Sequence, residues 1–363
     1  MKSAVPAATA IVMPTKPDMR VMLGMSGGVD SSVAALLLKQ SGADVLGVTL
    51  RLTEDDNGEN ARDAAAVAAA LGIPHTVYDL RAEFNTWVTD YFVQEFKCGR
   101  TPNPCIICNK KIKFGKMLDI AKEHDCAYIA TGHYAKVEQD ENNGLFALKK
   151  ASCAEKDQTY FLYTLNQETL SKVLMPLGSY QKAEVRALAE EFALISAKSR
   201  DSQDICFIPD GDKNRYLKQF LPETPGRFVD VNGNILGAHK GIFHYTVGQR
   251  KGLGIAFGKP MFVLSIHAES NTIVLGEAGS EFSRGCLVTD CNFIPFIAAP
   301  DGLECMCKVR YSAKETPCRL TKTKQGYDVQ FSVPQRAITP GQAAVFYVDD
   351  TVIGGGTIVS PLL

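Results

Sequence analysis

A loop of small residues between a predicted strand and a predicted helix constrains the fold of this 363-residue chain more than any other feature. The run Arg20–Met25 (RVMLGM) is apolar enough for a buried strand, and the stretch SSVAALLLKQSG that follows predicts a helix. The loop between them reads GMSGGVDSS. Small residues let the backbone approach a polyanion closely, and a helix N-terminus adds N–H donors and the positive end of its dipole. The alternative is a turn in which glycine serves geometry alone.

The rest of the first half alternates strands with helices. Three further strands are predicted at Asp44–Leu50, Pro74–Leu80 and Ala127–Tyr134. Helices are predicted between them, at Glu59–Leu71, Arg81–Lys97 and Asn109–His124. This alternation predicts an α/β fold with a doubly wound parallel sheet, whose ligands bind beyond the carboxyl ends of the strands.

The second half changes character from Gly226 onward. Short alternating runs such as MFVLSI, YDVQFSV and AAVFYV are separated by turn signals every eight to twelve residues or so, which is typical of β-barrels. We therefore expect a catalytic α/β domain at residues 1–209, a small connecting domain at 210–285 and a C-terminal β-barrel at 286–363. Residues 1–19 are expected to be a frayed extension rather than a signal peptide, because prolines interrupt their apolar run.

The composition is that of an ordinary globular protein, with 45% hydrophobic and 22% charged residues. The 39 basic and 40 acidic side chains give a net charge of −1, which shows no global preference for a polyanion. No stretch approaches the ~20 apolar residues of a membrane helix. An odd number of cysteines, 11, in a chain of this length does not suggest a disulfide framework. We expect a cytoplasmic protein with reduced thiols and no membrane partner.

Two cysteine segments are candidates for chemistry. Cys105 and Cys108 form a CxxC in the polar stretch GRTPNPCIICNKKIKF, just before a helix expected to begin near Asn109. A thiol at a helix N-terminus beside lysines is expected to be a good nucleophile. Cys206 lies in a second polar stretch, SQDICFIP. A zinc ribbon needs a second CxxC, which the sequence lacks, so the pair alone indicates a redox pair, half of a metal site or chance.

Two basic windows predict contact with RNA. Residues 97–124 carry seven basic and two acidic side chains, and residues 308–324 carry six and one. A charge run usually marks only a solvated face. However, one window flanks the CxxC and the other lies in a barrel of a kind that often binds RNA. Binding is expected to weaken with salt, because neutralising phosphates releases counterions.

Seven motifs occur in order over nearly the whole chain: GMSGGVDSS, GRTPNPxxxCNxxIKF, ATGHYA, KDQTYFL, SQDICFIP, YTVGQRKGLGI and KVRYS. The first resembles the PP-loop of ATP pyrophosphatases, which cleave ATP to AMP and pyrophosphate and adenylate a carbonyl oxygen. It is not a Walker A loop, since no Gly-Lys-Ser/Thr follows. Together the motifs resemble the bacterial tRNA-specific 2-thiouridylases, which replace the C2 oxygen of the wobble uridine with sulfur. The resemblance implies ATP and Mg²⁺ as cofactors and a tRNA with a modifiable wobble uridine as substrate. It also implies a persulfide or sulfide donor, either a cysteine desulfurase or a relay protein.

The resemblance implies roles for individual residues. Cys206 matches the cysteine that carries the persulfide, and Cys108 matches the partner that attacks it, leaving a disulfide. The nucleotide is expected at Gly24, Met25, Ser26, Gly27, Gly28, Val29, Asp30, Ser31, Leu50 and Gly132. Contacts with tRNA are expected at Asn103, Pro104, Cys105, Lys156, Asp157, Gln158, Arg310 and Tyr311, the first three around the target base.

One position departs from the family pattern. The best-known members carry an aspartate, credited as a general acid or base, where this chain has Cys105. Other PP-loop tRNA thiolases use three cysteines to hold a four-iron cluster with one open iron that binds sulfide. Thiolates are the expected ligands of such a cluster, so Cys105, Cys108 and Cys206 form a candidate set. The sequence does not decide between this cluster and the persulfide route.

Two other functions remain open at this point. An amide-forming adenylating ligase fed with ammonia would explain the SGGVDSS loop and leave the thiols without a role. A non-catalytic RNA-binding protein would explain the basic windows and leave the loop without a role. The stretch Gly252–Gly258 (GLGIAFG) misses the dinucleotide fingerprint by one residue and lies in a β-rich region, so no cofactor is expected there.

Overall fold

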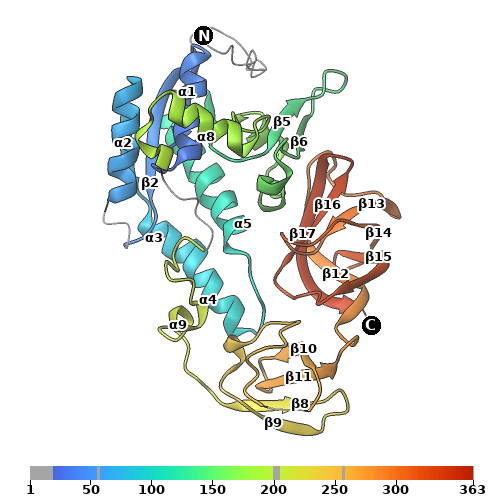
Figure 1. Ribbon diagram of the computed structural model, residues 1–363. Helices are drawn as coiled ribbons and strands as arrows, with labels where there is room; N and C mark the ends of the chain where they lie inside the picture. Colours follow the sequence, from blue (N-terminus) through green and yellow to red (C-terminus); the bar gives the residue numbers. More distant parts are fainter. Residues whose placement is uncertain (1–18, 55–57, 199–204, 256–257, 363) are drawn as a thin grey trace. The chain divides into compact units, whose positions relative to one another are not determined.

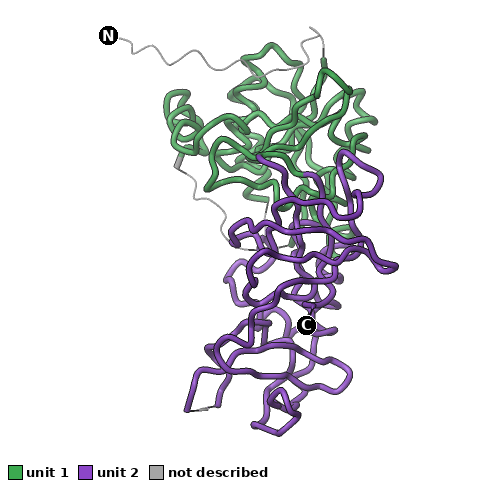
Figure 2. Tube along the Cα trace, turned by 90° about the vertical axis from the view of Figure 1, so that its right-hand side faces the viewer, with its two compact units in different colours: residues 1–85, 107–203, 350–352 green, residues 86–106, 204–349, 353–363 purple. Residues whose placement is uncertain are grey.

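The computed structural model describes residues 19–54, 58–198, 205–255 and 258–362. The chain forms two compact units, drawn in green and purple in Figure 2. Unit 1 comprises residues 1–85, 107–203 and 350–352, and unit 2 comprises residues 86–106, 204–349 and 353–363. The extension expected at residues 1–19 lies outside the described residues as far as residue 18.

Unit 1 is built on a parallel five-stranded sheet in the order β3-β2-β1-β4-β7 (Figure 1). Its strands are β1 (Arg20–Gly24), β2 (Asp44–Arg51), β3 (His75–Asp79), β4 (Tyr128–Ala130) and β7 (Val173–Leu174). The order reverses between β1 and β4, and α/β sheets bind ligands at such a switch point, outside the carboxyl ends of the strands. The doubly wound parallel sheet predicted from the sequence is confirmed.

Helices cover the sheet in two layers. The crossovers β1–α1–β2 and β2–α2–β3 run in one direction along the sheet, whereas the return from β3 to β4 runs in the other. Right-handed crossovers therefore put α1 and α2 on one face and α6 on the opposite face. The helix α8 packs beside α1. The bounds of these four helices are α1 (Val29–Gln40), α2 (Glu59–Leu71), α6 (Met117–Glu123) and α8 (Lys182–Glu191).

The two helices predicted between β3 and β4 are more irregular than expected. The first consists of α3 (Arg81–Phe84), a π-helical segment (Asn85–Thr89) and α4 (Asp90–Lys97). The second begins at Pro104 instead of near Asn109, as α5 (Pro104–Cys108), and continues through a π-helical segment (Asn109–Lys116) into α6.

Local chemistry explains the earlier start of this helix. The side-chain oxygen of Asn103 accepts a hydrogen bond from the Cys105 N–H at 3.2 Å, as an N-cap residue does. Pro104 takes the first helical position, where its missing N–H would have had no partner. The expectation that the CxxC lies in a loop before the helix is therefore wrong, because both cysteines are inside α5.

The remaining elements of unit 1 are short. The strands β5 (Lys136–Gln139) and β6 (Phe146–Lys149) form a hairpin, and the first residues of β17 pair with β6. The helix α7 (Gln167–Leu170) follows β6. Single 3₁₀ turns occupy Ala154–Lys156, Thr159–Phe161 and Ile195–Lys198.

The middle part of unit 2 is a four-stranded sheet in the order β10-β11-β8-β9. Its strands are β8 (Gly226–Val229), β9 (Ile235–His239), β10 (Met261–His267) and β11 (Thr272–Glu277), preceded by α9 (Lys213–Leu217), with a 3₁₀ turn at Ile242–His244. The sheet packs on a small apolar core of its own, which includes Phe228, Val263, Ile273 and Leu275.

The C-terminal part of unit 2 contains a closed six-stranded barrel in the order β12-β15-β14-β13-β16-β17, and a pairing between β12 and β17 closes it. Its strands are β12 (Phe282–Phe293), β13 (Leu303–Lys308), β14 (Thr316–Lys322), β15 (Tyr327–Arg336), β16 (Ala343–Val348) and β17 (Thr351–Leu362). Alternate residues of β14 are buried and exposed, as expected for a strand with one face on a core. The predicted barrel is confirmed. None of the described helices is long and apolar enough to span a membrane.

Candidate functional site

Serine hydroxyls shape the loop between β1 and α1. Ser31 Oγ accepts a hydrogen bond from the Ser26 N–H at 3.1 Å and donates one to the Gly28 carbonyl at 3.1 Å. Ser32 Oγ donates to the same carbonyl at 2.9 Å. Ser31 and Ser32 are buried, whereas Ser26 is exposed. The two buried serines therefore hold the loop, and the Ser26 side chain stays accessible to a ligand.

Glycines in and around this loop serve different purposes. Gly27 has φ +75°, and a Cβ there would lie 2.8 Å from the Asn60 carbonyl oxygen. Gly132, two residues after β4, faces the same loop, since a Cβ there would lie 2.9 Å from the Ser31 nitrogen. Gly28 has φ −80°, and a Cβ there would come no closer than 3.5 Å to another atom. Packing explains Gly27 and Gly132, whereas Gly28 fits a ligand that approaches the backbone.

Asp30, in the first turn of α1, is held by two side chains from elsewhere in unit 1. Its Oδ1 accepts hydrogen bonds from Lys182 Nζ at 2.7 Å and from Tyr134 Oη at 2.8 Å. The Lys182 side chain is only 14% exposed. Lys182 is the first residue of α8, where the positive end of the helix dipole disfavours a cation, and the Asp30 carboxylate offsets this cost. The loop thus carries an ammonium–carboxylate pair beside its N–H groups, with the ammonium largely buried and the carboxylate 36% exposed.

Sequence reasoning missed Lys182 and Tyr134. Lys182 is 152 positions from Asp30, so no local pattern joins them. One signal was available: Glu184 accepts a hydrogen bond from the Gln181 N–H at 2.7 Å, and a Gln-x-x-Glu pattern of this kind marks a helix start. A lysine in the first turn of that helix indicates a carboxylate nearby.

The carboxyl end of β2 is tied to the same loop. Thr49 Oγ1 donates to the Met25 carbonyl at 2.9 Å, and the Met25 N–H donates to the Val48 carbonyl at 2.8 Å. Thr49 Oγ1 also lies 2.9 Å from His75 Nε2, and burial lowers the pKa of His75. Leu50 follows on β2 and is half-buried. These contacts fix the predicted adenosine side of the site to the sheet.

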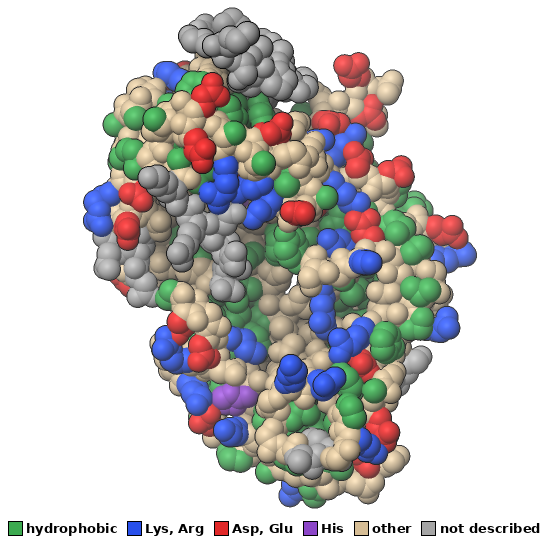
Figure 3. Space-filling model, in the orientation of Figure 1, with side chains coloured by type: hydrophobic (Ala, Val, Ile, Leu, Met, Phe, Trp, Pro, Cys, Tyr) green, Lys and Arg blue, Asp and Glu red, His purple; other side chains and the backbone are tan. Residues whose placement is uncertain are grey.

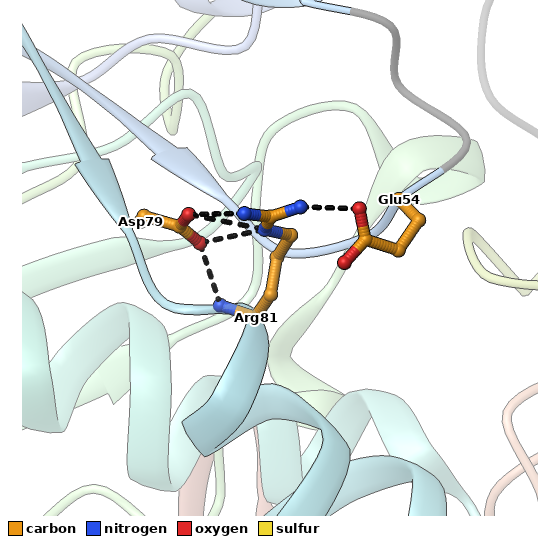
Figure 4. Close-up of polar contacts among 3 residues, drawn as sticks. All are labelled: Glu54, Asp79 and Arg81. Carbon is orange, nitrogen blue, oxygen red and sulfur yellow. Dashed lines mark hydrogen bonds and ion pairs between the residues drawn. The ribbon is translucent and has the colours of Figure 1, made fainter.

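An ion-pair network joins the carboxyl ends of β2 and β3 (Figure 4). Arg81 Nε donates to Asp79 Oδ1 at 2.8 Å, and the second terminal nitrogen of Arg81 donates to Asp79 Oδ2 at 2.6 Å. The other terminal nitrogen pairs with Glu54, in the segment after β2. The Arg81 hydrogen bonds lower the pKa of Asp79 to about 2. Asp79 is therefore ionised at neutral pH, and the network anchors the segment after β2 to the end of β3.

The three predicted thiols differ in exposure. Cys105 is exposed and Cys108 is buried, although both lie on the single short helix α5. Cys206 is exposed, in a turn closed by a 2.9 Å hydrogen bond from the Ile208 N–H to the Ile205 carbonyl. The next residue, Phe207, is buried and packs edge-on against Phe92. Residues 202–204 of the SQDICFIP motif lie outside the described residues.

Metal ligation was a second expectation for these thiols. Within residues 19–54, 58–198, 205–255 and 258–362, no three His, Cys, Asp or Glu side chains form a group that could hold a metal ion. The described structure therefore offers no support for the four-iron cluster on Cys105, Cys108 and Cys206.

Two side chains of the predicted triplet Lys156, Asp157 and Gln158 bind the protein itself. Asp157 accepts hydrogen bonds from the Ala151 N–H at 3.0 Å and from the Thr159 hydroxyl at 2.6 Å. Gln158 Oε1 accepts the Tyr134 N–H at 2.9 Å. Gln158 thus fixes the backbone of the tyrosine whose hydroxyl holds Asp30. A role of this triplet in binding tRNA stays a prediction.

The barrel offers a basic and partly aromatic surface. Tyr311 is 39% exposed, and Lys308 Nζ lies 5.6 Å from the centre of its ring. Four further basic side chains of this window are exposed: Lys314, Arg319, Lys322 and Lys324. Figure 3 shows Lys and Arg side chains on the displayed face of the molecule, interspersed with Asp and Glu side chains. Arg310, by contrast, binds inward, with its Nη2 donating to Thr339 Oγ1 at 2.7 Å.

Comparisons with known proteins cover nearly the whole chain. Three family models match: "tRNA methyl transferase HUP domain" at residues 19–210, "tRNA methyl transferase PRC-barrel domain" at 214–277 and "Aminomethyltransferase beta-barrel domain" at 283–358. A tRNA-specific 2-thiouridylase of Clostridioides difficile is 48% identical over 94% of this chain and 99% of its own length. Those of Lachnoclostridium phytofermentans and Acetivibrio thermocellus are each 46% identical, over 94% and 93% of this chain and 99% of their own lengths. The names of the first two family models refer to methyl transfer, whereas these full-length relatives are named for thiolation. The match to the full-length relatives is the more specific of the two.

Adjacent glycines of the loop test its described geometry. Gly27→Ala is expected to lower the free energy of unfolding by about 2–5 kcal/mol, because the left-handed backbone and the contact with Asn60 both oppose a Cβ. Gly28→Ala, the matched control, is expected to cost less than about 1 kcal/mol, the effect of alanine at an N-cap. Urea unfolding of both variants measures the difference, and equal stabilities would contradict this geometry.

Proposed function

The chain belongs to the family of tRNA-specific 2-thiouridylases, and we propose that it replaces the C2 oxygen of the wobble uridine of tRNA with sulfur, using ATP. Similarity to enzymes of that name over nearly the whole length carries this proposal. Neither of the two other functions, an amide ligase or a non-catalytic RNA-binding protein, accounts for this similarity. The geometry of the two units then suggests which residues take part.

ATP, with Mg²⁺, is the energy source that membership of this family implies. We assign its phosphates to residues 24–31, where the α1 N-terminus, the exposed Ser26 hydroxyl and the open backbone at Gly28 favour an anion. Leu50 and Gly132 are assigned to the adenosine side. Carboxylate oxygens are ligands that Mg²⁺ accepts, so Asp30 fits it, and the bound ion would neutralise phosphate charge. The Lys182 ammonium, 2.7 Å from Asp30, supplies a second positive charge for the phosphates.

Activation of the base precedes sulfur transfer. The uracil O2 attacks the α-phosphorus of ATP, and pyrophosphate leaves. The C2 oxygen then belongs to an adenylate and departs as AMP, a far better leaving group than the free oxygen. During this first step, negative charge moves onto the departing pyrophosphate. The preorganised charges at Asp30 and Lys182 are proposed to act on this step.

Two thiols then suffice for the transfer. The exposed Cys206 accepts a sulfur from a donor persulfide, and the donor leaves as its thiolate. The terminal sulfur attacks C2 as AMP departs, giving a disulfide between the base and Cys206. The Cys108 thiolate attacks Cys206 Sγ, releases the 2-thiouridine and forms the Cys108–Cys206 disulfide, which an external thiol reduces. Cys206 is exposed, as expected for a thiol that reacts with an external donor. Cys108 is buried, as expected for a thiol that reacts only within the enzyme.

The partners follow from this scheme. A protein persulfide, from a cysteine desulfurase or a relay protein, is the proposed donor. Asn103, Pro104 and Cys105 at the start of α5 are proposed to hold the target base, and Tyr311 with the exposed lysines of the barrel window to bind the RNA. A cytoplasmic location is part of the same proposal, because the scheme requires tRNA and reduced thiols.

Lys182→Met tests the nucleotide site. The substitution removes the ammonium and leaves the Asp30 carboxylate without its cation, so tRNA-dependent pyrophosphate release is expected to fall about 100-fold. Affinity for tRNA should stay within a few-fold of the parent. Lys172→Met is the control, because it removes a lysine from a surface pair with Glu168. A Lys182→Met enzyme with the parent rate and KM for ATP would contradict the assignment.

Cys105→Asp separates the two routes for sulfur. In the persulfide route the substitution restores the family's usual carboxylate, and transfer from a persulfide donor should stay within a few-fold of the parent. Cys108→Ser should abolish 2-thiouridine formation while AMP is still produced, and Cys98→Ser, at another exposed cysteine, should change neither. Nucleoside analysis and visible absorption of anaerobically purified protein are the measurements. Loss of transfer in Cys105→Asp, together with loss of iron and colour, would overturn the persulfide route and favour the cluster.

A further inference from the structure

A turn of the barrel is hydrogen-bonded to the segment that leads into α5. The Thr101 N–H donates to the Pro340 carbonyl at 2.9 Å. Gln342 Nε2 donates to the carbonyls of Thr101 at 2.8 Å and Pro102 at 3.3 Å. All of these residues belong to unit 2. We call residues 339–342 the clamp and residues 99–102 the clamped segment.

Close packing accompanies these hydrogen bonds. Gly341 has φ +89°, and a Cβ there would lie 3.0 Å from the Thr101 nitrogen. At the other end of the clamped segment, Gly99 has φ +72°, and a Cβ there would lie 2.8 Å from Ile266 Cγ2 on β10. The clamped segment therefore has backbone-close contacts with both the barrel and the four-stranded sheet.

Gln342 is well placed to hold two acceptors at once. Its backbone is fixed on both sides, because its N–H donates to the Thr339 carbonyl at 3.2 Å and its carbonyl accepts the Ile358 N–H at 2.8 Å. A side-chain amide has two N–H donors, and here it meets two consecutive carbonyls. A carboxylate of the same shape would place negative charge against both oxygens.

Arg310, two residues after β13, is hydrogen-bonded to the residues at the start of the clamp. Its Nη2 donates to Thr339 Oγ1 at 2.7 Å and also to the Ala337 carbonyl. Thr339 is 2% exposed, and its hydroxyl donates to the Ala337 carbonyl at 2.9 Å. The arginine that the family resemblance assigns to tRNA thus supports the turn that carries Gln342.

We propose that Gln342 is a positioning residue for sulfur transfer. The proposal rests on the proposed function, which puts the target base at Asn103–Cys105. By fixing Thr101 and Pro102, Gln342 fixes the chain immediately before the Asn103 N-cap, and so the place of Cys105 on the first turn of α5. A displacement of about 1 Å at a reacting group costs up to about 100-fold in rate, so a small loosening here lowers turnover without removing a contact to RNA.

Three variants test this role. Gln342→Glu keeps the shape and removes the donor, and Gln342→Met removes the donor without adding charge. Gln335→Glu is the matched control, a glutamine of the same barrel whose Nε2 donates to the Val333 carbonyl at 3.0 Å. Both Gln342 variants should exchange the Thr101 amide hydrogen faster, keep the tRNA dissociation constant within threefold and lower kcat at saturating tRNA about tenfold. Gln335→Glu should match the parent in all three measurements.

Other outcomes overturn the proposal. A raised KM for tRNA with unchanged kcat would make Gln342 a direct RNA contact, and unchanged amide exchange at residues 99–105 would show that it fixes nothing. If Gln342→Glu does not fold, the same criteria apply to Gln342→Met. A parent enzyme that makes no 2-thiouridine would overturn the proposed function, whereas faster exchange in the variants would still support the clamp.

Discussion

The ion pair between Asp30 and Lys182 is the interaction on which the nucleotide site depends. It joins the first turn of α1 to the first turn of α8, and the ammonium is largely buried. A buried charge is tolerated only with a partner, so the Lys182 ammonium requires the Asp30 carboxylate, which is 36% exposed, until a ligand replaces it. Phosphate oxygens can replace the carboxylate beside Lys182, and a divalent cation can replace the ammonium beside Asp30. The pair therefore holds in place the two charges that the proposed chemistry uses.

The two units divide the proposed work. Unit 1 carries the loop, its ion pair and the buried Cys108. Unit 2 carries the exposed Cys206, the barrel with its basic window and the clamped segment before Cys105. In the proposed scheme, nucleotide activation is assigned to the α/β sheet, and RNA binding to the β-rich part. The helix α5 contributes Cys105 to unit 2 and Cys108 to unit 1, and the proposed transfer step uses the start of this helix at Asn103.

Local sequence patterns predicted the strands and helices that form through local interactions. The strands β1–β3 and the helix Glu59–Leu71 followed from apolar runs and periodicity, and the barrel followed from its alternating strands. The predicted start of this helix, near Asn109, was wrong because the N-cap signal of Asn103 followed by Pro104 was not used. The partners of Lys182 and Gln342 could not be identified from the sequence, because they are 152 and 241 positions away and only the folded chain brings them together.

The most direct test of the account uses the purified protein, an unmodified tRNA transcript with a wobble uridine, ATP with Mg²⁺ and a protein persulfide. Mass spectrometry of the digested tRNA should find 2-thiouridine at the wobble position, with one AMP and one pyrophosphate formed for each sulfur transferred. Without ATP, no 2-thiouridine should form. Thiolation that proceeds without ATP, or AMP formation that never yields 2-thiouridine when the persulfide is supplied, would contradict the account.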